Sequence, residues 1–211
     1  MKISRVHIGS IYVVLLMICF SPGLVKAMGF GKGAGTSAPL EQSYVWYDGD
    51  REHTVWLDPT VVAEFNPGPA DESPLTKSFA GARVLPGKQA AVRFWQVDSV
   101  PAVTAVRSLK ERYPGGKFSP VMHDGPSAGS RKRALPGNVI VYLNPAWDGA
   151  AVQRWADSQG LQIVKQLQIG PNIYVIRTGA GLEALERANA LYKSGEVVAA
   201  FPDWWQEVST R

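Results

Sequence analysis

Cysteine is almost absent from this sequence, and histidine is scarce. The 211 residues include one cysteine, Cys19, and three histidines. Cys19 lies in an apolar stretch that we expect to be removed during export, which leaves the mature chain without a thiol. Such a chain forms no disulfide and offers neither a cysteine nucleophile nor a thiolate ligand for a metal. We expect no cofactor and no metal.

The N-terminus has the layout of a secretory signal peptide. Lys2 and Arg5 precede the apolar run 11–20, and Val25-Lys26-Ala27 is typical of a cleavage site. A membrane-spanning helix needs about 20 apolar residues, and this run is much shorter. We therefore expect residues 1–27 to be a signal peptide cleaved after Ala27, and the mature protein to be periplasmic or secreted and not held in a membrane.

An excess of positive charge is also missing once the signal is removed. The precursor has 22 Lys and Arg residues against 18 Asp and Glu, and Lys2, Arg5 and Lys26 leave with the signal. The mature chain is nearly neutral, so its net charge does not indicate binding to nucleic acid. The basic run 131–133 lacks interleaved aromatic residues, so we interpret it as part of a solvated linker that a trypsin-like or kexin-like protease could also cleave.

Catalytic constellations are missing as well. Gly125-Pro126-Ser127-Ala128-Gly129 matches a serine nucleophile pattern, but it has linker-like flanks and no histidine follows it. His53 and His123 lie far apart in sequence, and we interpret them as surface residues rather than metal ligands. The sequence predicts a binding protein and not an enzyme.

The N-terminal half is rich in strand signals. Residues 28–41 are glycine-rich and predict a flexible leader. Two β-prone runs flank Asp48-Gly49, which predicts a hairpin over 44–57. Asp58-Pro59 then predicts a turn before a third strand over 61–65. We expect a β-rich domain over 42–123.

A weak internal repeat spans the middle of the chain. Arg83-Val-Leu-Pro-Gly87 recurs as Arg133-Ala-Leu-Pro-Gly137, and each copy leads into an apolar strand, a helical pattern and a second strand. Five matching positions indicate either a duplication or two similar entries into a strand. The Gly- and Ser-rich segment between the two units predicts a linker over 124–137.

The C-terminal third has the clearest pattern. A strand over 139–143 precedes a helix over 148–158 that Asp148 can cap, and Gly160 ends that helix. A hairpin turns at Gly170-Pro171-Asn172, a second helix ends at Gly195, and residues 197–201 predict the last strand. The fold class is therefore α+β, with a βαββαβ, ferredoxin-like domain over 138–211 whose helices cover one face of an antiparallel sheet.

This third of the chain resembles the propeptide domains of subtilases, the subtilisin-type serine proteases. The matching stretches are hydrophobic patterns over 138–143, 172–176 and 181–185, with a final Val197-Val-Ala-Ala-Phe-Pro-Asp203 strand. The region 44–65 is also similar to an N-terminal strand region of some bacterial subtilase precursors. No catalytic domain follows Arg211, so the chain looks like the external chaperones that accompany kexin-like bacterial subtilases.

The resemblance implies a function and a partner. Such a protein would assist the maturation of a subtilisin-like, kexin-like serine protease and then inhibit it from the active-site cleft. Two alternatives stay open, namely an envelope or matrix-binding module and an inhibitor without a chaperone role.

The C-terminal tail supplies the candidate binding residues. Trp204 and Trp205 point to opposite sides of an extended segment, so at least one of them is a candidate for the rim of an interface. By resemblance, Arg211 would occupy the primary pocket of the protease, and Thr210, Ser209 and Val208 would occupy the next subsites. The predicted protease-binding set is Trp204, Trp205, Val208, Ser209, Thr210 and Arg211.

Overall fold

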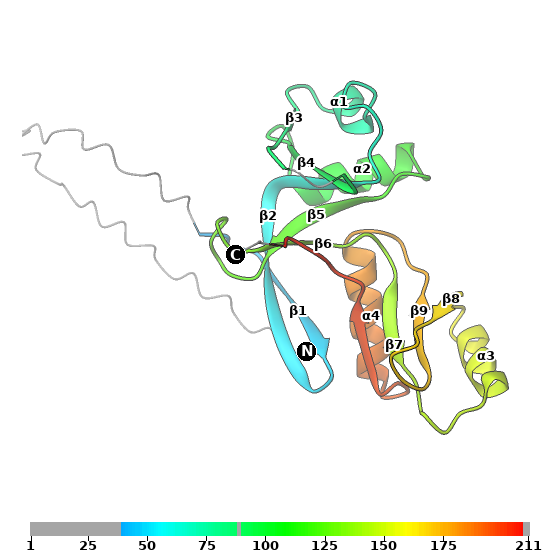
Figure 1. Ribbon diagram of the computed structural model, residues 1–211. Coiled ribbons are helices and arrows are strands. Elements are labelled where there is room, and N and C mark those ends of the chain that lie inside the picture. The colour runs from blue at the N-terminus through cyan, green and yellow to red at the C-terminus, as the bar shows by residue number, and fades with distance from the viewer. Residues whose placement is uncertain (1–38, 88–89, 209–211) are drawn as a thin grey trace, which may run out of the picture. The chain divides into compact units, whose positions relative to one another are not determined.

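The protein is described by a computed structural model that covers residues 39–87 and 90–208. It is a mixed α and β structure with two antiparallel sheets and a few helices (Figure 1). The predicted signal peptide and most of the predicted leader lie outside the described residues, as do Ser209, Thr210 and Arg211. Within the described part, no helix combines the length and the apolar character that crossing a bilayer requires.

The larger sheet, here called the N-terminal sheet, has seven strands in the order β11-β6-β5-β2-β4-β3, with β1 also paired to β2. Its strands are β1 (Ser43–Asp48), β2 (Arg51–Phe65), β3 (Arg83–Val84), β4 (Val92–Gln96), β5 (Phe118–His123), β6 (Lys132–Ala134) and β11 (Trp205–Gln206). Helices α1 (Pro74–Ser78) and α2 (Ala102–Arg112) pack on it through a core that includes Leu75, Trp95, Leu109 and Phe118.

The predicted hairpin over 44–57 is confirmed, but the predicted turn at Asp58-Pro59 is wrong. Strand β2 runs through both residues, and Figure 1 shows it as one long, bent strand. Its pairing with β5 shifts between Leu57 and Val62. The Asp58 carboxylate accepts hydrogen bonds from the backbone N–H groups of Thr60 and Val61 at 3.0 and 3.1 Å. The side chain therefore satisfies backbone donors inside an irregular strand, where the sequence pattern suggested a chain reversal.

Both copies of the repeat fold as a strand, a helix and a strand. In the N-terminal sheet β2 lies between β4 and β5, and in the other sheet β9 lies between β7 and β8. The two pentapeptides behave differently, because β3 pairs with the β4 strand that follows it, whereas β6 pairs with β5 and β11. The segment 124–137 is accordingly more than a linker: it holds the β5–β6 connection and strand β6.

The second sheet, here called the C-terminal sheet, has four strands in the order β10-β7-β9-β8. Its elements follow one another as β7 (Val139–Tyr142), α3 (Gly149–Ser158), β8 (Ile163–Gln166), β9 (Ile173–Ile176), α4 (Leu182–Ser194) and β10 (Ala199–Pro202). This is the predicted β-α-β-β-α-β order, and every neighbouring pair is antiparallel. One face packs on both helices through a core that includes Val141, Val152, Trp155, Ile176 and Leu191.

Local signals explain where these elements begin and end. The Asp148 carboxylate accepts a hydrogen bond from Ala151 N at 2.7 Å and caps α3, as predicted. Gly195 ends α4 with φ 72°, a left-handed conformation that glycine adopts without strain. Asn172 has φ 52°, and its amide donates to the carbonyl groups of Asn144 and Trp147 at 2.8 Å. These bonds hold the β8–β9 turn against the segment before α3.

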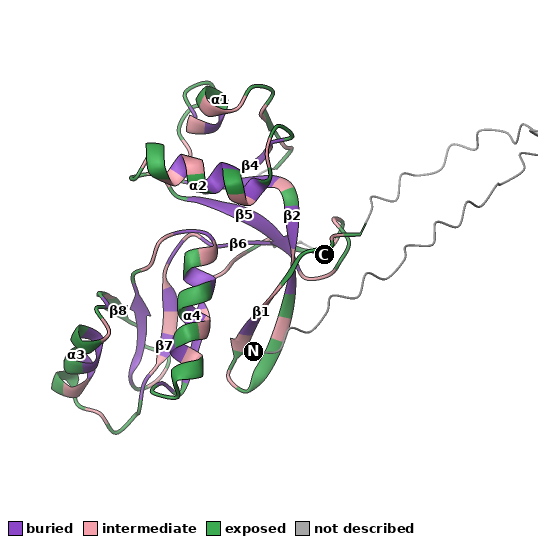
Figure 2. Cartoon of the chain, turned by 180° about the vertical axis from the view of Figure 1, so that it is seen from behind, coloured by how far each residue is buried: buried purple, intermediate pink, exposed green. Residues whose placement is uncertain are grey.

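Helix α4 has two buried faces and not one. Ala188 and Leu191 belong to the core of the C-terminal sheet. Ala184 and Leu185 pack instead with Trp46, Val55, Met122 and Leu135 of the N-terminal sheet. Figure 2 shows α4 exposed along its outer side. The expectation that the helices cover one face of the C-terminal sheet therefore did not include the second packing face of α4, because helical periodicity identifies an apolar position but not the element that covers it.

Candidate protein-binding surface

The C-terminal sheet has one face that helices α3 and α4 do not cover, here called the open face. At its β10 side, Phe201 packs against the cluster that contains Trp46 and Trp204. Alternation along the strands places Ile140 and Tyr142 of β7 and Phe201 of β10 there, because Val139, Val141 and Ala200 point into the helix-covered core. All three side chains are half-buried. The rings of Tyr142 and Phe201 meet edge to face, with 5.7 Å between their centroids. The open face is therefore an apolar, aromatic surface suited to a protein partner.

The C-terminal tail does not run away from the fold after Pro202. Strand β11 pairs with β6, where Trp205 lies opposite Ala134 and Gln206 lies opposite Arg133. The pairing continues through Glu207, whose N–H donates to Lys132 O at 3.0 Å. The tail is extended, as predicted, but the chain itself holds it as far as Glu207. Among the described tail residues, only Val208 lies beyond this pairing.

The two predicted tryptophans point to opposite sides of the tail, and each packs against this chain. The ring of Trp205 lies 5.2 Å from that of Phe94 and joins the core around Val61, Ala63 and Val121. Trp204 packs beside Trp46, with 5.7 Å between ring centroids. Both side chains are half-buried. We expected at least one of them to lie at the rim of a partner interface. The sequence did not indicate that the tail lies between two cores of its own chain.

An arginine ties these aromatic residues together. The guanidinium carbon of Arg133 lies 5.5 Å from the ring centroid of Trp46 and 5.6 Å from that of Trp204. Arg133 also forms an ion pair with Asp124, as does Arg131. Burial alone would raise the pKa of Asp124, but the hydrogen bonds and charges of Arg133 and Arg131 hold that pKa below its usual value. The basic run predicted to be a solvated linker thus contains a buried structural arginine.

A recess joins the tail to the open face. It has a volume of about 290 Å³, and its lining includes Trp46, Ile140, Phe201, Asp203 and Trp204. Ile140 and Phe201 belong to the open face, whereas Trp204 belongs to the tail. A partner that sits on the open face would therefore also meet the start of the tail.

Of the predicted tail residues that follow, the structure describes only Val208. Val208 is 78% exposed and belongs to none of the apolar cores. Ser209, Thr210 and Arg211 are outside the described residues, so their predicted roles are not addressed by the fold. Four residues at about 3.3 Å each can extend roughly 13 Å.

The serine motif lies in the connection between β5 and β6, not between a strand and a helix. Ser127 is exposed, and its hydroxyl accepts a hydrogen bond from Gly129 N at 3.2 Å. The nearest histidine in sequence, His123, has both ring nitrogens occupied: Nδ1 lies 2.9 Å from Ser130 O, and Nε2 lies 3.3 Å from the Asp58 carboxylate. A histidine held in this way has no nitrogen left to accept a proton from Ser127.

The histidines were wrongly interpreted as surface residues. His123 is fully buried beside Asp58. Burial alone would raise the pKa of Asp58, but hydrogen bonds from His123 and Thr60 hold it below its usual value. His53 is half-buried and stacks on Trp46, with 4.5 Å between ring centroids. Among residues 39–87 and 90–208, no three His, Cys, Asp or Glu side chains gather in a way that could hold a metal.

Sequence reasoning missed Trp46, Arg133 and the open-face residues Ile140, Tyr142 and Phe201 as parts of this surface. Strand alternation could have identified the last three, because Val139 and Val141 point into the core and the residues that alternate with them point to the opposite face. For Trp46 and Arg133 no local signal exists, because their contact depends on how β1, β6 and the tail come together.

Comparisons with profiles of known families, with curated proteins and with solved structures found no match to this chain.

Proposed function

We propose that this protein is a secreted external chaperone and inhibitor of a subtilisin-family serine protease. The observation that carries the proposal is the open face of the C-terminal sheet, which is continuous through a recess with an extended C-terminal tail. A folded protease can engage both features at once, with its surface helices on the open face and its substrate cleft around the tail.

The order of strands supports this assignment. The strand order β10-β7-β9-β8, with helices after the first and third strands of the unit, supports the ferredoxin-like fold that the resemblance to subtilase propeptides leads us to expect. In that arrangement both crossing helices lie on one side of the sheet, so the opposite side is left for a partner.

The tail supports the inhibitory role. Because β11 is held by β6, the residues from Val208 onward start from a defined place next to the open face. A pre-positioned segment loses less conformational entropy on binding than a freely moving one. Arg211 at the end of the tail would fit an acidic primary pocket through a charge-assisted pair, in keeping with a kexin-like preference for basic residues.

Chaperoning and inhibition follow from the same interface. A protein that binds the folded protease but not its unfolded chain stabilises the folded state by mass action. At a concentration a thousandfold above the dissociation constant, this amounts to about 4 kcal/mol.

The test is inhibition and refolding of a kexin-like bacterial subtilase produced without a propeptide. Adding this protein should raise the yield of active protease on refolding and should then inhibit turnover of a chromogenic peptide. Tyr142→Ala should weaken inhibition about tenfold or more, because aromatic anchors dominate interface energies. Tyr113→Ala is the matched control, since Tyr113 is a half-buried tyrosine at the end of α2. If the two variants inhibit equally well, the open face is not part of the interface. If the protein does not change the refolding yield, it is an inhibitor without a chaperone role.

A further inference from the structure

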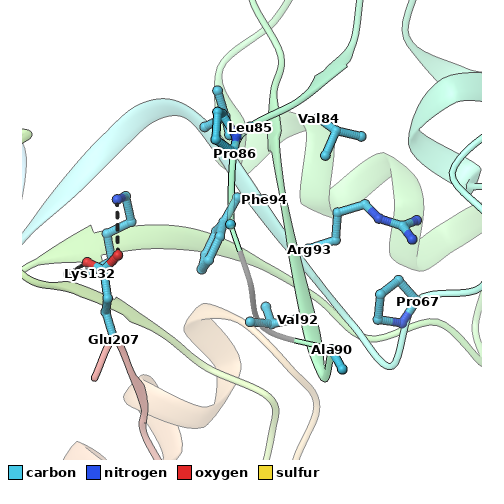
Figure 3. Close-up of a pocket in the computed structure, with 11 residues that line it drawn as sticks. Pro67, Val84, Leu85, Pro86, Ala90, Val92, Arg93, Phe94, Lys132 and Glu207 are labelled. Carbon is cyan, nitrogen blue, oxygen red and sulfur yellow. Dashed lines mark hydrogen bonds and ion pairs between the residues drawn. The ribbon is translucent and has the colours of Figure 1, made fainter. Parts of the chain in front are cut away.

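A groove lies on the N-terminal sheet, away from the open face. It has a volume of about 630 Å³, and its apolar floor and walls come from Pro67, Val84, Leu85, Pro86, Val92 and Phe94. Lys132 and Glu207 lie at one end, and Figure 3 shows Phe94 between them and Arg93. The proposed protease interface does not use this groove.

The groove exists because the N-terminal sheet curls on itself. Phe94 is on β4 and Trp205 is on β11, and three strands separate β4 from β11 in the sheet order. Their rings nevertheless lie 5.2 Å apart. The two edges of the sheet, β3 and β11, thus both border the region of the groove, and Val84 of β3 and Glu207 next to β11 contribute to its lining.

Among the described residues, each edge presents a peptide group that points away from its partner strand. Leu85 N donates to Phe94 O, and Glu207 N donates to Lys132 O. In an antiparallel pair, hydrogen bonding alternates along the strand, so the peptide groups of Val84 and Gln206 point away from their partner strands. In the part of the chain that the structure describes, no further strand pairs with β3 or β11. Such edges are the sites at which an extended peptide adds to a sheet.

The charged groups of the lining form ion pairs within the chain, although Arg93 Nη1 is buried without a hydrogen-bond partner. The Arg93 guanidinium donates to Gly68 O at 2.7 Å and lies 3.6 Å from the Glu64 carboxylate. Lys132 Nζ lies 3.6 Å from the Glu207 carboxylate. Opposite charges therefore lie together at the border of the groove, and its apolar side chains are complementary to an uncharged apolar side chain and not to a charged one.

Two occupants fit this surface poorly. The three residues that follow Val208 are Ser209, Thr210 and Arg211, which are polar or charged. A second copy of this chain paired edge to edge through the outward-pointing Val84 peptide groups would place Arg83 of one copy opposite Leu85 of the other, which brings a charged side chain against the apolar lining.

We propose that this groove binds an extended segment of a partner polypeptide, which adds a strand to the β3 edge and places a bulky apolar side chain against Leu85, Val92 and Phe94. The inference rests on the proposed function and deepens it. The natural occupant is an unfolded segment of the client protease, so the chain holds its client by two surfaces, one for the unfolded and one for the folded state.

The probe is a fluorescein-labelled, threonine-rich peptide with one central phenylalanine, titrated against the full mature chain by fluorescence anisotropy. Saturable binding is expected. Replacing the phenylalanine by serine, or N-methylating the backbone on one side of the extended peptide, should each weaken binding about tenfold or more. The first change removes the side chain from the groove, and the second removes strand pairing.

The protein variant is Val84→Asp, which places a charge at the 45% exposed rim, and the matched control is Val198→Asp at a 60% exposed valine far along the sequence in the C-terminal unit. Val84→Asp should weaken peptide binding about tenfold or more, whereas Val198→Asp should not change it. Equal binding by the two variants, or no saturable binding by the unmodified chain, overturns the proposal. A concentration-dependent dimer that Val84→Asp abolishes would overturn it in favour of a second copy as occupant.

Inhibition of the folded protease separates this inference from the proposed function. Val84→Asp should inhibit the folded protease as well as the unmodified chain does. A chain that binds the peptide but inhibits no subtilase contradicts the proposed function and leaves the groove assignment standing. A chain that inhibits a subtilase but does not bind the peptide supports the proposed function and contradicts the groove assignment.

Discussion

The guanidinium carbon of Arg133 lies 5.6 Å from the ring centroid of Trp204, which brings the basic run before the C-terminal unit into contact with the tail after it. Trp46 of the first hairpin completes the cluster. Three segments that are far apart in sequence are thus joined at one place, at the start of the tail.

This cluster predicts that Trp204 stabilises the fold. Trp204→Ala removes the ring contacts with Trp46 and Arg133, so the free energy of unfolding should fall by about 1–3 kcal/mol for a half-buried ring. Urea unfolding followed by circular dichroism measures the change. Val208→Ala is the control and should be neutral, because Val208 is 78% exposed. A Trp204→Ala chain as stable as the control would show that the cluster contributes nothing to folding.

Acid stability should depend on Asp58. Its pKa is lowered in the folded chain, so it contributes stability above its unfolded pKa of about 3.9 and loses that contribution as the pH falls through its folded pKa. Asp58→Asn should lower the free energy of unfolding at pH 7 by about 1–3 kcal/mol, since His123 loses its charged partner. The variant should also lose less stability than the unmodified chain between pH 4 and lower pH. The measurement is urea unfolding at a series of pH values. If the free energy of unfolding falls equally in the variant and the unmodified chain below pH 4, Asp58 does not cause the acid sensitivity.

The two sheets should unfold together. Leu185 of α4 is 2% exposed and packs with Trp46 and Met122 of the N-terminal sheet. Leu185→Ala should cost about 2–5 kcal/mol, and Leu185→Asp should abolish folding because it buries an uncompensated charge. For Leu185→Ala, tryptophan fluorescence and circular dichroism should report one shared transition. Two separated transitions would show that residues 138–201 fold independently of the rest.

The tail should be required for tight inhibition but not for folding. Deleting residues 208–211 should raise the inhibition constant against the partner protease tenfold or more, since losing a buried charged pair at an interface typically costs about 2–5 kcal/mol. The melting temperature should not change, because pairing between β11 and β6 is retained. If the truncated chain inhibits as tightly as the intact one, the tail does not enter the active site.

The serine in the β5–β6 connection should have no catalytic role. Ser127→Ala should leave every measurable activity unchanged, because both nitrogens of His123 are engaged with Ser130 O and Asp58. Assays with ester and peptide substrates provide the check. Turnover by the purified chain that this substitution abolishes would establish an enzyme.

Elements with local signals could be predicted from the sequence. Helices α3 and α4 begin and end close to the expected residues, because Asp148 caps the first and Gly195 terminates the second through contacts within a few residues. The order of elements after 138 was predicted for the same reason, and so was the hairpin at Asp48-Gly49. Periodicity and turn chemistry are properties of neighbouring residues, and the sequence presents them directly.

Tertiary structure alone decided the rest. Strand β2 continues past Asp58-Pro59 because β5 pairs with it both before and after these residues, and β6 forms within an expected linker because β5 and the tail pair with it. His123 is buried because the strand that carries it lies at the centre of a sheet. Each outcome depends on pairing between residues that are distant in the chain. The local sequence around a peptide group or an apolar side chain does not determine which distant partner will cover it.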